Sequence, residues 1–129
     1  MRYMMLIYSN EMPEVSERNY EPHRALIDEA TRAGVFVAAE PLAPPSSTTT
    51  LQIEDGRTLI TDGPFAESKE QLGGYYIFDC ENLDLAIEWA AKIHTACTAS
   101  VSIEIRPMPG MPTLSNADAV PSKSLVRET

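Results

Sequence analysis

The chain has 129 residues, a length that fits one domain. Its 19 Asp and Glu outnumber its 10 Lys and Arg, which gives a formal net charge of −9. Because an acidic surface repels phosphate groups, the composition argues against a nucleic-acid-binding protein and against a protein of anionic membrane surfaces. Cys80 and Cys97 are isolated and lack metal-ligand spacing, so we expect two free thiols in a reducing compartment and no metal site.

Residues 2–8 predict the first strand. Its apolar side chains form two sets on opposite faces: Tyr3, Met5 and Ile7, and Met4, Leu6 and Tyr8. Such a strand is expected to be covered on both faces. The apolar run is too short to span a bilayer and no small-residue cleavage site follows, so we expect a strand of a cytoplasmic protein, with no membrane association.

A helix is predicted over residues 22–33, because Pro22 suits the first helical turn and Gly34 suits the position after the last. A second strand over residues 35–39 follows. The pair Asp55-Gly56 between two runs of β-forming residues predicts a hairpin over residues 48–61. Asp62-Gly63-Pro64-Phe65 is a second turn, with Phe65 expected in the core, and residues 66–71 predict one helical turn.

The second half repeats the order strand, helix, strand. Residues 72–79 predict a strand that is again apolar on both faces, and Asn82 can cap a helix over residues 83–93. The apolar stripe expected on that helix is Leu83, Ala86, Ile87 and Ala90, widened by Trp89. Residues 101–106 alternate strictly, with Val101, Ile103 and Ile105 expected to face inward. Residues 1–107 then form the domain and residues 108–129 a tail rich in Pro and Ser.

This order predicts an α+β fold, a ferredoxin-like sandwich with an inserted β-hairpin. Both helices would cover one face of an antiparallel sheet and leave the other face open. Because the central strands are apolar on that face too, we expect a second copy to cover it. The two sheets would then pair as a dimeric α+β barrel, which makes the chain a homodimer.

The stretch from Thr61 to Tyr76, which contains Asp62-Gly63-Pro64-Phe65 and Gly73-Gly74, resembles the signature of the DGPF proteins of the YCII-related family. The resemblance extends over residues 1–107. It implies a dimeric α+β barrel with a cleft beside the sheet. The family's function is largely undetermined, a catalytic His–Asp pair has been suggested for some members, and DGPF members are often encoded beside extracytoplasmic-function sigma factors.

His23 matches the position of the family's histidine. The aspartate expected after the second helix has no counterpart, since the chain reads Lys92-Ile93-His94-Thr95 there. His94 stands where DGPF proteins usually carry proline. The residues do not decide whether His94 replaces the missing aspartate or whether His23 is catalytic or structural.

Four further groups are candidates for a site. Asp62 can fix its turn or act as a general base, so His23 and Asp62 are the catalytic candidates. Glu67 and Glu70, three apart, can share a face and bind ligand, or form a solvated surface turn. Tyr75 and Tyr76 point to opposite faces, so one can pack in the core while the other reaches a ligand.

The glycines at 73 and 74 predict a bulge or a close approach by a ligand or the partner chain. No phosphate-binding loop, dinucleotide fingerprint or metalloprotease motif occurs, so no cofactor is expected. Two functions stay open. One is a dimeric small-molecule-binding protein or cofactor-independent acid/base enzyme. The other is a non-catalytic regulatory module that contacts a protein such as a sigma factor.

Overall fold

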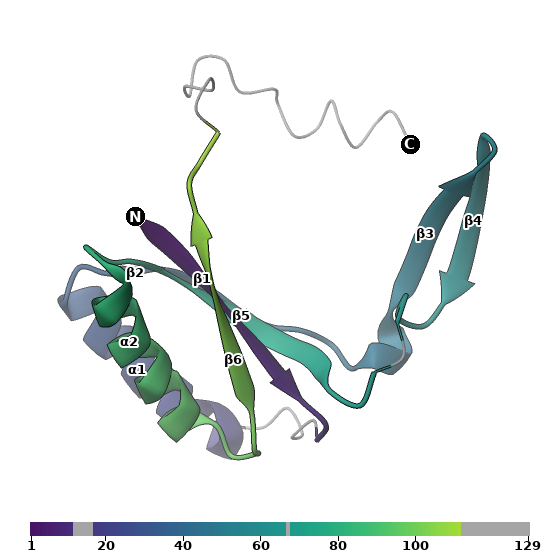
Figure 1. Ribbon diagram of the computed structural model, residues 1–129. Helices are drawn as coiled ribbons and strands as arrows, with labels where there is room; N and C mark the ends of the chain where they lie inside the picture. Colours follow the sequence, from purple (N-terminus) through teal and green to yellow (C-terminus); the bar gives the residue numbers. More distant parts are fainter. Residues whose placement is uncertain (12–16, 67, 112–129) are drawn as a thin grey trace.

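The computed structural model describes residues 1–11, 17–66 and 68–111 (Figure 1). Their elements follow the predicted order: β1 (Arg2–Ser9), α1 (Glu17–Arg32), β2 (Phe36–Pro41), the short 3-10 helix η1 (Pro45–Ser47), β3 (Thr49–Glu54), β4 (Arg57–Asp62), β5 (Gln71–Asp79), α2 (Leu83–Ala96) and β6 (Ser102–Met108). Of the tail predicted over residues 108–129, residues 112–129 lie outside the described residues. No helix among the described residues is long and apolar enough to cross a membrane.

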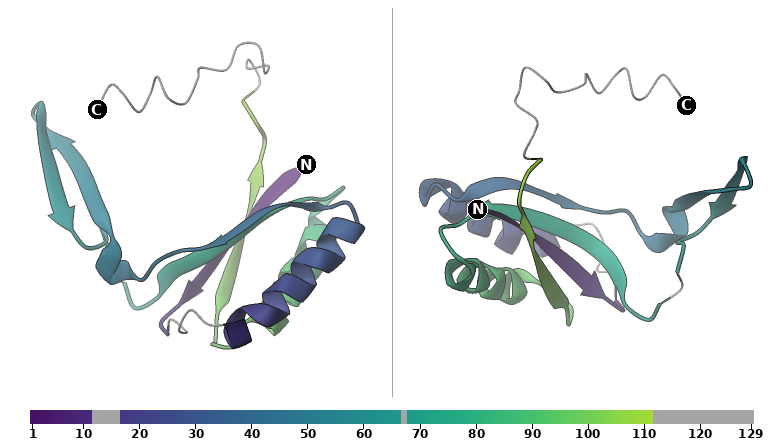
Figure 2. Two further views of the ribbon diagram at one scale, coloured as in Figure 1. Left: turned by 180° about the vertical axis from the view of Figure 1, so that it is seen from behind. Right: turned by 45° about the horizontal axis from the view of Figure 1, so that its top comes forward.

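The body is an α+β sandwich. Four strands form an antiparallel sheet in the order β2-β5-β1-β6. Both helices cover the same face of this sheet (Figures 1 and 2). The chain therefore has the predicted ferredoxin-like fold, in which each helix connects two parallel strands that a third strand separates.

Helix α1 begins five residues earlier than predicted. Pro22 lies inside it, where the missing N–H removes one helical hydrogen bond. The prediction was wrong because Pro22 was interpreted as a first-turn residue, although the polar residues before it are compatible with a helix. The predicted end is confirmed: Gly34 has φ of +77°, and the amides of Gly34 and Val35 donate to the Thr31 and Ala30 carbonyls.

Helix α2 begins where the sequence predicts. The side-chain oxygen of Asn82 accepts a hydrogen bond of 2.9 Å from the Leu85 amide. The predicted apolar stripe is partly wrong, because Leu83 and Ile87 are exposed. Ala86 and Ala90 of the predicted stripe are buried, and Ile93 and Ala96 complete the buried face. The small alanine side chains let the helix lie close to the strands.

Aromatic rings form the centre of the core. Phe78 on β5 is fully buried, and its ring centroid lies 5.5 Å from those of Tyr76 and Trp89. On the surface, Lys92 of α2 joins α1 through a 2.8 Å ion pair with Glu29. The helix layer and the sheet are thus connected from the core outwards.

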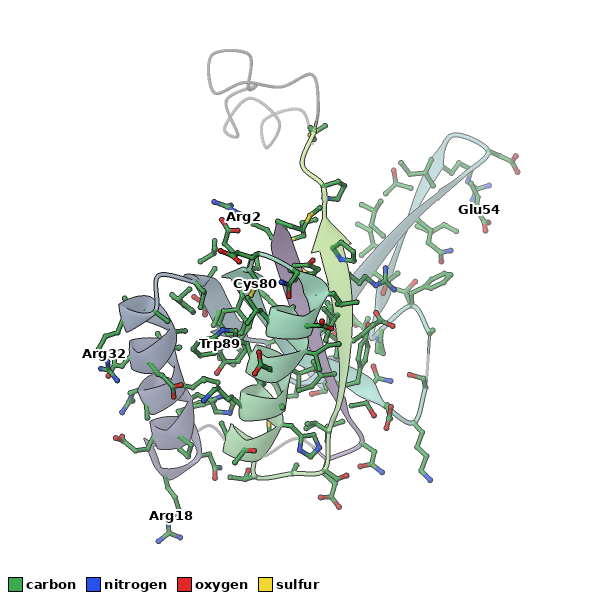
Figure 3. All side chains as sticks on the ribbon, turned by 60° about the vertical axis from the view of Figure 1, so that its left-hand side comes forward. Arg2, Arg18, Arg32, Glu54, Cys80 and Trp89 are labelled. Atoms are coloured by element: carbon green, nitrogen blue, oxygen red, sulfur yellow. The ribbon has the colours of Figure 1, made fainter. Side chains whose placement is uncertain are left out.

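The inserted hairpin is a separate two-stranded sheet of β3 and β4, which we call the arm (residues 49–62). Its turn is confirmed, because Asp55 and Gly56 have φ of 51° and 76°, as tight hairpin turns require. Figure 3 shows Glu54 at the tip of the arm, far from Cys80 and Trp89 in the body.

The segment between the arm and β5 differs from the prediction. Among its described residues, no helical turn forms between 66 and 70. Phe65 is 75% exposed, so its expected place in the core is wrong for the single chain. The turn at Gly63, which has φ of +100°, is fixed by the Thr48 carbonyl and the Thr50 hydroxyl rather than by the Asp62 carboxylate.

Candidate functional site

A cavity of about 350 Å³ opens between α1 and the sheet, at the end where β2 finishes and β5 begins. This volume lies within the range of small-molecule sites. Most of its wall is apolar, formed by Ile7, Ile27, Ala39, Leu42, Pro44 and Val101. The cavity thus lies beside the sheet, where the resemblance places a cleft.

Two polar side chains meet in the cavity wall. Nδ1 of His23 lies 2.5 Å from the hydroxyl of Tyr76, and the ring centroids of these residues are 5.9 Å apart. The pair joins α1 to β5 across 53 positions of the chain. Tyr20, one turn before His23, contacts the His23 ring edge-on. The histidine is therefore held between two tyrosines.

Burial keeps both members of the pair neutral near pH 7. Desolvation lowers the pKa of His23 below its usual value of 6.5. Burial, and secondarily the neighbouring Cys97, raises the pKa of Tyr76 well above its usual value. The predicted helix over residues 22–33 would place His23 in its first turn, but α1 begins at Glu17 and His23 lies in its second turn. Desolvation rather than the helix N-terminus therefore accounts for the lowered pKa.

A neutral imidazole has one N–H and one bare nitrogen, so the pair has two arrangements. If Tyr76 donates to Nδ1, Nε2 carries the proton and is a hydrogen-bond donor. If Nδ1 donates to the Tyr76 oxygen, Nε2 is a proton acceptor and the tyrosine hydroxyl can donate to a ligand. The second arrangement provides a base and an acid in one small site.

Further polar cavity residues were not candidates in the sequence analysis: Ser9, Asn19, Cys97, Thr98 and the exposed charged residues Glu11, Arg24 and Glu40. The buried Ser9 hydroxyl lies 3.0 Å from the Ser100 carbonyl, which ties β1 to the segment after α2. Cys97 presents a half-buried thiol whose pKa burial raises, and Asn19 lines the cavity mouth. Only Ser9 carried a signal: it continues the inward alternation of Tyr3 and Met5.

Asp62 does not join His23 in the described chain. It lies at the end of β4, is exposed and does not line the cavity. Glu70 is also exposed and outside the cavity, while Glu67 lies outside the described residues. His94 is exposed on α2 and likewise does not line the cavity. Of the predicted histidine and carboxylate candidates among the described residues, the cavity thus contains His23 alone.

The two tyrosines divide as alternation predicts. Tyr76 is buried on the helix side, and Tyr75 lies on the opposite side at the cavity rim. One residue combines both expected roles, since Tyr76 is part of the core and also directs its hydroxyl to the cavity. Register shifts at Gly73, which confirms a bulge. The close approach is to Gly74 and comes from β2 of the same chain, where a Cβ would meet the Glu40 carbonyl oxygen at 3.0 Å.

Among the described residues, no group of three or more His, Cys, Asp or Glu side chains is arranged to hold a metal ion. The two cysteines lie in different environments: Cys80 is buried in the core and Cys97 borders the cavity. The chemistry that these residues can supply is proton transfer and hydrogen bonding.

Comparison with known proteins assigns the fold to a described family. The model of the YCII-related domain matches residues 1–109. An uncharacterized protein of Rhizobium meliloti (strain 1021) is 34% identical over 114 residues, which are 84% of this chain and 92% of that protein. These matches bear out the resemblance that the motif at residues 61–76 carries.

Proposed function

Because the chain belongs to the YCII-related domain family, we propose that it binds a small molecule in the His23–Tyr76 cavity and transfers a proton without a cofactor. The observation that carries this proposal is the 2.5 Å contact between the His23 ring and the Tyr76 hydroxyl in the cavity wall. Neutral titratable groups paired in a concave, largely apolar space are typical of sites for acid/base chemistry.

The wall of the cavity defines the ligand class. An apolar wall favours an apolar ligand, because burial of the ligand's surface supplies the binding free energy. One neutral polar group on that ligand, such as a hydroxyl, carbonyl or amide, would pair with His23 and Tyr76. The charged lining residues Glu11, Arg24 and Glu40 are all exposed, so a charged group of the ligand would lie at the solvent side of the cavity rather than beside His23 and Tyr76.

Proton transfer uses the arrangement in which Nδ1 of His23 donates to Tyr76. The bare Nε2 accepts a proton from the ligand while the Tyr76 hydroxyl donates a hydrogen bond to the ligand's polar group. The lowered His23 pKa keeps this base unprotonated at neutral pH. The raised Tyr76 pKa keeps the hydroxyl a donor rather than an anion.

The functional unit of this proposal is a homodimer. Met4, Leu6 and Tyr8 of β1 and Ile77 of β5 lie on the sheet face that the helices do not cover, here called the open face (Figure 1). The open face of a second copy is an apolar surface of the same kind, and a two-fold axis would pack the two open faces against each other. Sedimentation velocity of the full chain measures this directly, and a monomer at micromolar concentration contradicts it.

The binding proposal is tested by calorimetric melting against a panel of neutral aromatic and aliphatic alcohols, ketones and amides. A compound at about a hundred times its dissociation constant adds roughly 2.7 kcal/mol to the free energy of unfolding, a shift of several degrees. His23→Gln should abolish the shift. His94→Gln is the matched control, since it alters the exposed histidine outside the cavity.

The thiols locate the bound compound. A compound in the cavity should slow alkylation of Cys97 and leave Cys80, buried in the core, unchanged. A shift that survives His23→Gln, or a panel without any shift, contradicts the proposal. Loss of the shift in both histidine variants also contradicts it, because that result means a general loss of stability.

A further inference from the structure

The arm has one apolar face that no other described residue of the single chain covers. Leu51 is directly opposite Ile60 across the hairpin, and Ile53 lies two residues further along the same face. These three side chains are 59%, 67% and 67% exposed. The opposite face carries polar residues and one apolar residue, Leu59, which is 38% exposed. The hairpin is thus amphipathic, although it pairs with no other strand of residues 1–11, 17–66 and 68–111.

We propose that the arm of each copy packs this face, Leu51, Ile53 and Ile60, against the second copy in the homodimer. The inference rests on the proposed homodimer and adds a second contact to that of the open faces. An isolated two-stranded hairpin is marginally stable in water, so a protein that keeps one extended from its body needs a surface to cover it.

The position of the arm favours a second copy as its partner. Figures 1 and 2 show the arm on the side of the sheet away from the helices, so the arm and the open face border the same space. A body that fills this space contacts both. A second copy provides the flat apolar sheet that the open face needs, and two-fold symmetry gives each arm the same environment.

The exposed area suits a stable dimer. Taking about 200 Å² for a large apolar side chain, the exposed fractions of Leu51, Ile53 and Ile60 amount to roughly 400 Å² per arm. Two arms contribute roughly 800 Å², about half of a standard interface of roughly 1,600 Å². The open faces add the partly exposed side chains of Met4, Leu6, Tyr8 and Ile77 from each copy.

Charge does not oppose the contact. The outward residues of β6 lie opposite the apolar residues of β1, with Glu104 beside Leu6 and Arg106 beside Met4. Glu104 and Arg106 pair at 2.8 Å within one chain. The β6 edge of the open face therefore carries internally neutralised charge, whereas Glu40, in register with Tyr75, adds one exposed carboxylate at the opposite edge on β2. Two copies can approach along β6 without a net like charge between them.

The test is the dissociation constant of the dimer, measured by sedimentation velocity. The double variant Leu51→Thr, Ile60→Thr keeps residues that favour strands and removes the apolar face. We expect the dissociation constant to rise about a hundredfold or more, because four large side chains per dimer lose their burial. Leu59→Thr is the matched control on the other face of the same strand, and we expect it to leave the constant unchanged.

Crosslinking gives a second readout that does not depend on stability. A photoreactive maleimide is placed at Ile53→Cys or at Gln52→Cys, on opposite faces of β3, in a Cys97→Ala background. We expect a covalent dimer from Ile53→Cys and little from Gln52→Cys. Equal crosslinking from the two positions overturns the inference.

The outcomes separate the two proposals. A wild-type monomer overturns both the homodimer and the docking of the arm. A wild-type dimer whose dissociation constant is the same in the double variant overturns the docking of the arm alone and leaves the homodimer intact.

Discussion

Replacement of Tyr76 by phenylalanine tests the His23–Tyr76 pair most directly, because it removes one oxygen atom and retains the ring that packs on Phe78. The hydrogen bond is worth about 1 kcal/mol net, and the half-buried imidazole is left with one unsatisfied nitrogen. We expect the free energy of unfolding to fall by roughly 1–2 kcal/mol, and the melting midpoint by about 4–8 °C.

The matched control is Tyr3→Phe. Tyr3 is also buried, at 7% exposure, but it does not line the cavity. The Tyr3 hydroxyl makes no hydrogen bond to His23 or Tyr76, so we expect its removal to change the free energy of unfolding by less than about 0.5 kcal/mol. A comparable loss of unfolding free energy in the two variants would mean that any buried tyrosine hydroxyl contributes this much stability, and would refute the specific role of Tyr76.

Nitrogen NMR adds a readout that stability alone does not provide. The chain has two histidines, so His94→Gln leaves the ring of His23 as the single histidine signal. In wild type we expect the tautomer protonated at Nδ1 to dominate, because the proposed proton transfer uses the arrangement in which Nδ1 donates to the Tyr76 hydroxyl. In Tyr76→Phe we expect a mixture of tautomers. An unchanged tautomer ratio in that variant would refute the reasoning even if the midpoint falls.

Three other predictions concern stability. Burial lowers the His23 pKa, so the unfolded chain binds a proton at this imidazole at a higher pH than the folded chain does. The free energy of unfolding should therefore fall as the pH drops below 6.5 towards the folded-state pKa. The pH dependence of the denaturant midpoint, compared between wild type and His23→Gln, measures this loss. Gly74→Ala should cost about 1–3 kcal/mol, since its Cβ would meet the Glu40 carbonyl at 3.0 Å, and urea unfolding tests this. Asn82→Ala should cost about 1 kcal/mol through the lost helix cap; an unchanged melting midpoint would contradict this.

Local signals predicted the elements well. The glycine after α1, the asparagine before α2 and the Asp55-Gly56 turn each act through residues a few positions away, so the sequence alone contains the information. The strict alternation of β6 is confirmed for the same reason. The order of these elements was enough to predict the ferredoxin-like topology, because connection rules leave few alternatives.

The errors have physical causes of a different kind. On α2 two apolar stripes overlap, and the one that faces the sheet consists mostly of alanines rather than of Leu83 and Ile87. Which stripe is buried depends on how closely the helix approaches the strands, which helical periodicity does not determine. Phe65 was expected in the core because it is aromatic, yet the turn around it directs it to solvent.

The site was harder to predict than the fold. His23 was a candidate on its resemblance to the family, but its partner is Tyr76 rather than an acid. That pairing depends on how α1 crosses the sheet, and no local pattern contains it. Ser9 and Cys97 enter the cavity for the same reason, through chain segments about ninety residues apart.

The aromatic core has a consequence for optical spectroscopy. Trp89 is the one tryptophan in the chain, and Phe78 separates it from Tyr76, whose hydroxyl lies in the cavity wall. Light absorbed by the tyrosines can pass to this indole, and its emission depends on the packing immediately behind the cavity. The protein therefore carries an intrinsic reporter, and a molecule that displaces Tyr76 should change the emission of Trp89 without any added dye.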